Sequence, residues 1–101
     1  MKISQATELT VAAYIREDIN DLEMEDVDIL KAIMGAAKQF IVGQTGMTAE
    51  ECDEKEDLTL AYLMICSDMW DNRYYSMPAN KVAVLNPAAK AIIDQYQMHI
   101  L

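Results

Sequence analysis

Apolar residues recur three and four positions apart in four stretches of the chain, which is the spacing of amphipathic helices. These stretches cover residues 7–17, 25–41, 57–75 and 86 to the C-terminus. A short β-prone run, 81–85, ends a connector formed by residues 76–85. Three Gly and two Pro are too few for the many turns of an all-β fold. The pattern therefore predicts an all-α bundle of about four helices, with a short first helix and a connector before the last.

Capping residues mark several of the expected helix boundaries. Thr7 is a predicted N-cap, and Thr48 with Glu51 has the spacing of a capping box that begins a short additional turn. Asn86 before Pro87 is a strong start, because Asn caps free N–H groups and Pro at the first helical position loses nothing. The other expected boundaries are an N-cap at Asp57 and helix ends at Gly43 and Gly46.

The third expected helix is the most enclosed one. On a helical wheel it leaves only a narrow polar strip, and apolar or aromatic residues fill most other positions. We therefore expect this helix at the centre of the bundle. The polar strip consists of Asp57, Asp68, Asp71 and Asn72. The large side chains expected in the core are Ile33, Phe40, Ile41, Leu60, Leu63 and Trp70.

Size and charge narrow the range of functions. The 101 residues predict a single domain spanning 1–101, and 52% hydrophobic residues suffice for its core. The formal net charge of −9 repels both phosphate backbones and anionic lipid surfaces. We therefore expect no sequence-specific nucleic-acid binding and no membrane association. No signal peptide or long apolar run is visible, so an intracellular, soluble protein is expected.

No residue pattern indicates catalysis. The single histidine, His99, lies close to the C-terminus, where a general base is poorly fixed. Cys52 and Cys66 lack the spacing of a disulfide framework or a metal site. Thirteen of the seventeen carboxylates fall in residues 17–28 and 50–57, and neither segment fits a calcium-binding loop. We expect these carboxylates to form a solvated acidic surface. A metal-dependent enzyme that uses them is the minor alternative. The sequence thus predicts a non-enzymatic protein without cofactor or metal.

Arg73 is the most unusual charged residue, because it falls on the apolar arc in the last turn of the third expected helix. Its guanidinium must reach the helix end or meet a carboxylate, since an unpaired buried charge is costly. The carboxylate is either an acid of the same chain, most readily from residues 17–28, or one from a neighbouring subunit.

The aromatic and Met side chains around Arg73 are either core or a partner-binding patch. They are Met69, Trp70, Tyr74, Tyr75 and Met77. Asp68 and Asp71 share the polar strip and are expected to face water or a neighbouring subunit. The candidate interface or ion-pair residues are Arg73, Asn72, Trp70, Asp68 and Asp71.

Two of these helices carry residues that point to a known family. The second reads ILKAIMGAAKQFI over residues 29–41, and the third ends MWDNR over residues 69–73. A Thr-capped first helix ending AYIR over residues 13–16, followed by an acidic segment, precedes them. This order resembles the tailed-phage head–tail connector (adaptor) family. Its members are small all-helical proteins of phages and prophages, some of them described as possible DNA-packaging proteins.

The resemblance covers most of residues 7–75 and implies a structural role in virion assembly. Subunits of this family form a ring below the portal after DNA packaging, extend the channel and provide the platform for the tail. The implied partners are further copies of the chain, the portal protein and a tail-proximal connector or tail protein. The implied location is the host bacterial cytoplasm and then the virion. It also suggests that residues 76–86 are mobile in the free subunit and become ordered against a neighbour.

A freestanding acidic helical protein is the alternative class. Such a protein mimics the charge of DNA and inhibits a DNA-binding protein. Both classes are acidic, but they differ in assembly. A mimic works as a monomer or dimer with carboxylates spaced like phosphates, whereas an adaptor needs complementary patches that close a ring through heterologous contacts.

Overall fold

The computed structural model describes residues 1–73 and 86–96, and within these ranges all regular structure is helical. The α-helices are α1 (Glu8–Tyr14), α2 (Met24–Thr45), α3 (Ala49–Asp53), α4 (Glu56–Asp71) and α5 (Pro87–Asp94). Two 3₁₀ turns, η1 (Ile3–Gln5) and η2 (Ile19–Asp21), flank α1. The predicted small all-α bundle is confirmed. The predicted β-prone run, 81–85, and all of the segment expected to be mobile, 76–86, except Asn86 lie outside the described residues, as does His99.

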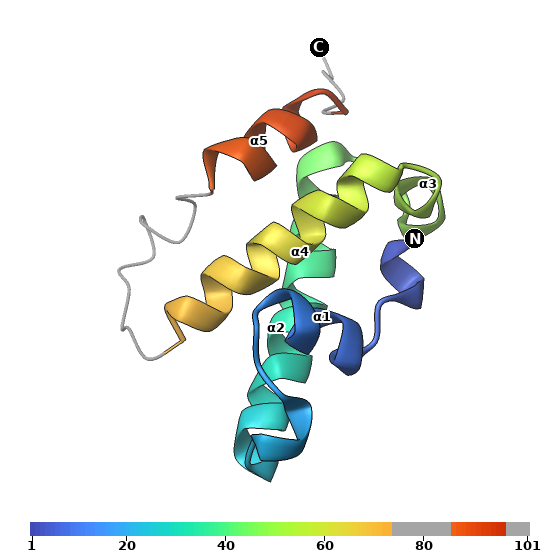
Figure 1. The fold of residues 1–101 in the computed structure, drawn as a ribbon. Helices are drawn as coiled ribbons and strands as arrows, with labels where there is room; N and C mark the ends of the chain where they lie inside the picture. Colours follow the sequence, from blue (N-terminus) through green and yellow to red (C-terminus); the bar gives the residue numbers. More distant parts are fainter. Residues whose placement is uncertain (74–85, 97–101) are drawn as a thin grey trace.

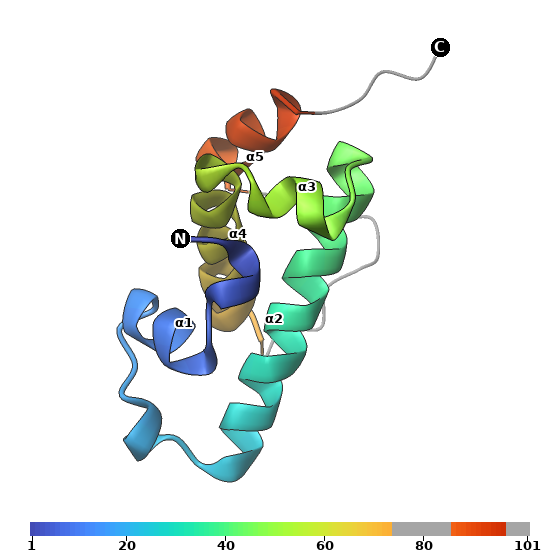
Figure 2. The same ribbon diagram turned by 90° about the vertical axis from the view of Figure 1, so that its right-hand side faces the viewer.

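Helix α4 lies at the centre, as the sequence predicts. It crosses the long helix α2, while α1 and η1 pack on one side of it and α5 on another (Figures 1 and 2). Helix α3 bridges the end of α2 and the start of α4. Helix α4 thus contacts α1, η1, α2, α3 and α5, and α5 also contacts α2.

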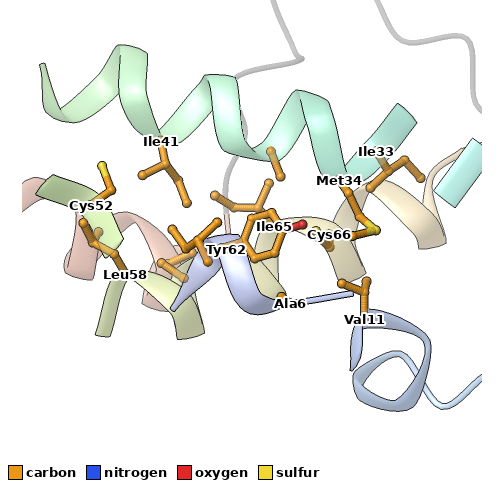
Figure 3. Close-up of a cluster of buried hydrophobic side chains, with 14 of the residues drawn as sticks. Ala6, Val11, Ile33, Met34, Ile41, Cys52, Leu58, Tyr62, Ile65 and Cys66 are labelled. Carbon is orange, nitrogen blue, oxygen red and sulfur yellow. The ribbon is translucent and has the colours of Figure 1, made fainter. Parts of the chain in front are cut away.

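The core lies mainly between α2 and α4. The most deeply buried side chains of α4 come from successive turns of the helix. A period of 3.6 residues per turn places such side chains on one face, which packs against a neighbouring helix. Figure 3 shows side chains from α2, α4 and the N-terminal segment filling one layer. Buried members of that layer are Ala6, Val11, Ile33, Met34, Ile41, Leu58, Tyr62, Ile65 and Cys66.

Most of the predicted caps are present. The Thr7 and Thr48 hydroxyls accept hydrogen bonds from backbone N–H groups of their first turns, and both form capping boxes. The Asn86 side chain accepts from the N–H groups of Ala88 and Ala89. Gly46 ends α2 with a φ of 72°, which a glycine adopts without steric cost.

Several sequence-based predictions need correction. Leu60 is 42% exposed, so the described helices around α4 do not enclose this position. Phe40 and Leu63 are only partly buried. Gly43 lies within α2, which continues to Thr45 because a glycine weakens a helix without ending it. Asp57 is in the first turn of α4, and Lys55 occupies the N-cap.

The first helix is shorter than predicted. Helix α1 ends at Tyr14, and Arg16 adopts a left-handed φ of 64° that turns the chain toward η2. Val11 and Ala12 carry the packing of this helix, whereas Leu9 is 63% exposed.

Candidate interaction site at the end of helix α4

Arg73 closes the C-terminal end of α4. Its guanidinium carbon lies 3.8 Å from the centroid of the Trp70 ring, and its Nη1 donates a hydrogen bond of 2.6 Å to the Trp70 carbonyl oxygen. A cation stacked on an indole and bonded to a helix-terminal carbonyl gains from the ring quadrupole and from the helix dipole. Trp70, with 2% of its surface exposed, belongs to the core, so its expected role in the core is borne out.

Asn72 is the C-cap residue of this helix. Its side-chain Nδ2 donates to the Asp68 carbonyl oxygen at 2.8 Å, and its backbone N–H donates to the same oxygen at 3.2 Å. Asp71, beside it, is exposed to solvent. The proposed ion pair of Arg73 with an acid of residues 17–28 or of a neighbouring subunit stays a prediction. Tyr74, Tyr75 and Met77 lie outside the described residues.

Asp68 connects α4 to the start of α5. Its Oδ2 accepts a hydrogen bond of 3.2 Å from the backbone N–H of Asn86, the residue that caps α5. Asp68 is partly buried in this position. The carboxylate expected to face water or a neighbouring subunit therefore serves as an anchor for the last described helix.

A second carboxylate of the polar strip holds the other end of α5. The Tyr96 hydroxyl lies 2.7 Å from Oδ1 and 2.8 Å from Oδ2 of Asp57, to which it donates. This hydrogen bond, followed by desolvation, raises the pKa of the Tyr96 phenol. The ammonium of Lys55 lies 6.0 Å from the centroid of the Tyr96 ring. Between the two anchors, Ala89 and Ile93 are buried, so α5 is fixed antiparallel along α4.

The sequence identifies Asp57 and Asp68 as members of one polar strip but does not identify their partners. Tyr96 falls on the apolar face of the last helix, and only its hydroxyl marks it as a residue that also needs a polar neighbour. The partner lies 39 residues away along the chain. In the sequence, these anchors are indicated by two acids that lie about three turns apart on an otherwise apolar helix.

The two acidic segments lie at opposite ends of α2. Residues 17–28 include η2 and the first turn of α2, and residues 50–57 include α3 and the start of α4 (Figure 2). The intervening helix has 22 residues and a length of about 33 Å. Among residues 1–73 and 86–96, no three His, Cys, Asp or Glu side chains come close enough to hold a metal ion.

Both thiols are buried and outside any disulfide. Burial raises the pKa of Cys66 to about 11. Burial also raises the pKa of Cys52, against the effect of its hydrogen bond with Thr45, 3.8 Å from Sγ to Oγ1. Both side chains are therefore protonated thiols at neutral pH, and they pack as small apolar groups.

No helix in the part of the chain that the structure describes combines the length and apolar character needed to cross a membrane. Comparison of the chain with protein-family models, with curated proteins and with solved structures gives no match.

Proposed function

We propose that the protein is a head–tail connector (adaptor) subunit of a tailed phage or prophage, which forms a ring below the portal after DNA packaging. In this role it acts without catalysis and without a cofactor. Its partners are further copies of itself, the portal protein and a tail-proximal connector or tail protein.

The packing of α2 against α4 is the observation that supports this role most directly. Residues 29–41 of α2 and residues 57–73 of α4 and its end are the segments that resemble the adaptor family. They pack on each other as the central helix pair of an all-helical subunit, and α1 and α5 lie around them. If the resemblance were confined to separate surface segments, the matching residues would not form one packed helix pair.

The charge distribution is compatible with a DNA conduit. A passage lined by chains of net charge −9 repels the phosphate backbone and lets DNA move without being held. A DNA mimic needs carboxylates along one continuous face. Here the two acidic segments lie at opposite ends of α2, which favours the adaptor over the mimic.

A stop codon in the gene tests this proposal in the phage or prophage that encodes it. We expect heads that are filled with DNA but carry no tails, and restored tails when the protein is supplied in trans. Empty heads would contradict a role after packaging, and normal virions would contradict any role in assembly. Inhibition of a DNA-binding enzyme by the purified monomer would support the mimic instead.

A further inference from the structure

The N-terminal segment is held on the bundle by few contacts. Residues 1–6, which form a strap over the bundle, include η1 and pack on α3 and α4 (Figure 2). Two of the six side chains are buried, that of Ile3 and the methyl group of Ala6. The next element, α1, is held separately by the buried Val11 and Ala12. The strap therefore depends on one large apolar side chain.

Two hydrogen bonds to described residues join the strap to the helices beneath it. The backbone N–H of Ser4 donates to Oδ1 of Asp53 at 3.0 Å. The Thr59 hydroxyl donates to the Met1 carbonyl oxygen at 2.8 Å. The first bond is exposed to solvent and the second is partly buried, so water can replace the lost partners when the strap leaves. These bonds orient the strap, but they hold it only weakly.

Further hydrogen bonds of the strap lie within its own turn. The backbone N–H of Gln5 donates to the Lys2 carbonyl oxygen at 3.0 Å. The backbone N–H of Ala6 donates to the Ile3 carbonyl oxygen at 3.1 Å. The hydroxyl of Thr7 then caps α1. Because the bonds of the turn stay within the strap, it can leave without breaking a hydrogen bond of α1.

The strap also forms one wall of an apolar cavity of about 250 Å³. Ile3 and Ser4 line the cavity from the strap, and α2 and α3 supply the other lining residues. One of these is Cys52 of α3, which is 2% exposed. When the strap leaves, the cavity loses a wall and becomes a groove that is open to solvent. The Cys52 thiol is then accessible.

Two other motions also expose Cys52. One is unfolding of the whole bundle, which any substitution that weakens a helix makes easier. The other is loss of α3, a helix of five residues that begins at the Thr48 cap. Weakening that cap makes this second motion easier. Opening of the strap instead becomes easier when the contact of Ile3 is weakened, so the three routes to Cys52 respond to different substitutions.

We infer that residues 1–6 open from α3 and α4 as one unit while α1 stays in place, and that this opening gives solvent its access to Cys52. A segment with few buried apolar contacts opens at a smaller free energy than the core does. The strap is thus a conformational device of the subunit itself. The inference does not rest on the proposed function, because the opening takes place in the isolated chain. Its failure would leave the adaptor role standing, and normal virions without the protein would leave the strap standing.

Thiol labelling of the purified full chain tests this opening. Native protein is treated with iodoacetamide, and peptide mass spectrometry gives the reaction rate at Cys52. Ile3→Ala should raise this rate about tenfold or more, because closing the strap no longer buries a large side chain. Thr59→Val, a milder change that keeps the helix packed, should raise it about fivefold through the loss of one hydrogen bond. Rates that stay at the value of the unaltered protein in both variants would contradict the inference.

Two control variants separate the strap from the other routes. Ile93→Ala removes a similarly buried isoleucine from α5, and Thr48→Ala removes the cap of α3. Each should leave the Cys52 rate nearly unchanged. A response to Ile93→Ala as large as that to Ile3→Ala would mean that Cys52 reacts only through global unfolding, and the inference would be wrong. A larger response to Thr48→Ala than to Ile3→Ala would assign the access to α3 and would also overturn it.

Amide exchange gives an independent test that the strap opens as a unit. A single turn released into water does not keep its hydrogen bonds, so the amides of Ser4, Gln5 and Ala6 should exchange with one common opening free energy. The amide of Val11 in α1 should exchange more slowly. Thr59→Val should speed exchange of the three strap amides by the same factor, about fivefold. Protection of Ser4 equal to that of Val11, or three unrelated responses to Thr59→Val, would show that the strap does not open as one unit.

Discussion

The Tyr96 hydroxyl donates to the Asp57 carboxylate across two helices, with oxygen–oxygen distances of 2.7 and 2.8 Å. This contact fixes the C-terminal end of α5 on the N-terminal end of α4. The Asp68–Asn86 hydrogen bond fixes the opposite end of α5. The attachment of α5 therefore depends on two acids of α4. Asp57 accepts from a side-chain hydroxyl, and Asp68 accepts from a backbone N–H group.

Replacing Tyr96 by Phe should loosen α5 selectively. Amide exchange over residues 87–94 should become faster, while the amides of α2 keep their protection. The bond raises the folded-state pKa of Tyr96 above its ordinary value of 10.0, so its stabilising effect is present below pH 10 and is lost as the pH rises through the folded-state value. The difference in stability between wild type and Tyr96→Phe should accordingly shrink above pH 10. A difference that grows there would contradict the bond.

Asp68→Ala should destabilise the protein by about 1 kcal/mol, because the partly buried N–H of Asn86 loses its acceptor. Asp71→Ala is the matched control, since Asp71 is exposed one turn further along the same helix, and its effect should stay within about 0.5 kcal/mol. Urea unfolding of both variants measures the difference. Equal effects would show that the Asp68 carboxylate acts only through its charge.

Tyr62→Phe should leave stability unchanged or raise it slightly. The Tyr62 side chain is fully buried, and its hydroxyl makes no hydrogen bond of ordinary geometry with a described residue. The Cys66 thiol, one turn away, is only a weak partner. Removing the hydroxyl thus removes a poorly satisfied polar group, whereas Tyr62→Ala should cost about 3–5 kcal/mol through the cavity it leaves. A loss above about 1 kcal/mol in Tyr62→Phe would reveal a strong hydrogen bond.

Arg73→Met keeps an apolar stem over Trp70 and removes the charge. Loss of the stacked cation and of the bond to the Trp70 carbonyl should lower stability by about 1–2 kcal/mol and shift the fluorescence of Trp70, the single tryptophan. A loss of about 3–5 kcal/mol would indicate a buried carboxylate left without its partner. Unchanged stability with weakened assembly would instead support the inter-subunit ion pair.

The local features of the fold were predictable because they depend on residues close in sequence. The caps at Thr7, Thr48 and Asn86 each need only a hydroxyl or amide side chain followed by a free N–H group. Leu60 was mispredicted because a helical wheel gives the width of an apolar face but not the number of helices that cover it.

Long-range partners left almost no local signal in the sequence. The Thr59 hydroxyl donates to the Met1 carbonyl oxygen at 2.8 Å, and together with the bond from Ser4 to Asp53 it holds the N-terminal segment against the bundle. Nothing near Thr59 or Asp53 specifies a partner about 50 residues earlier. The same holds at the candidate interaction site, where the polar strip was visible but its attachment to α5 was not.

Anchoring at both ends makes the docking of α5 bivalent. While the Asp57–Tyr96 bond holds, the other end of the helix stays at a high effective concentration near Asp68, and an opened contact re-forms before the helix can leave. Full release requires both ends to be open at once, so its probability falls roughly as the product of two separate openings. Helix α5 therefore leaves α4 as a unit: weakening one anchor raises the probability of full release in proportion, and weakening both raises it by the product of the two effects.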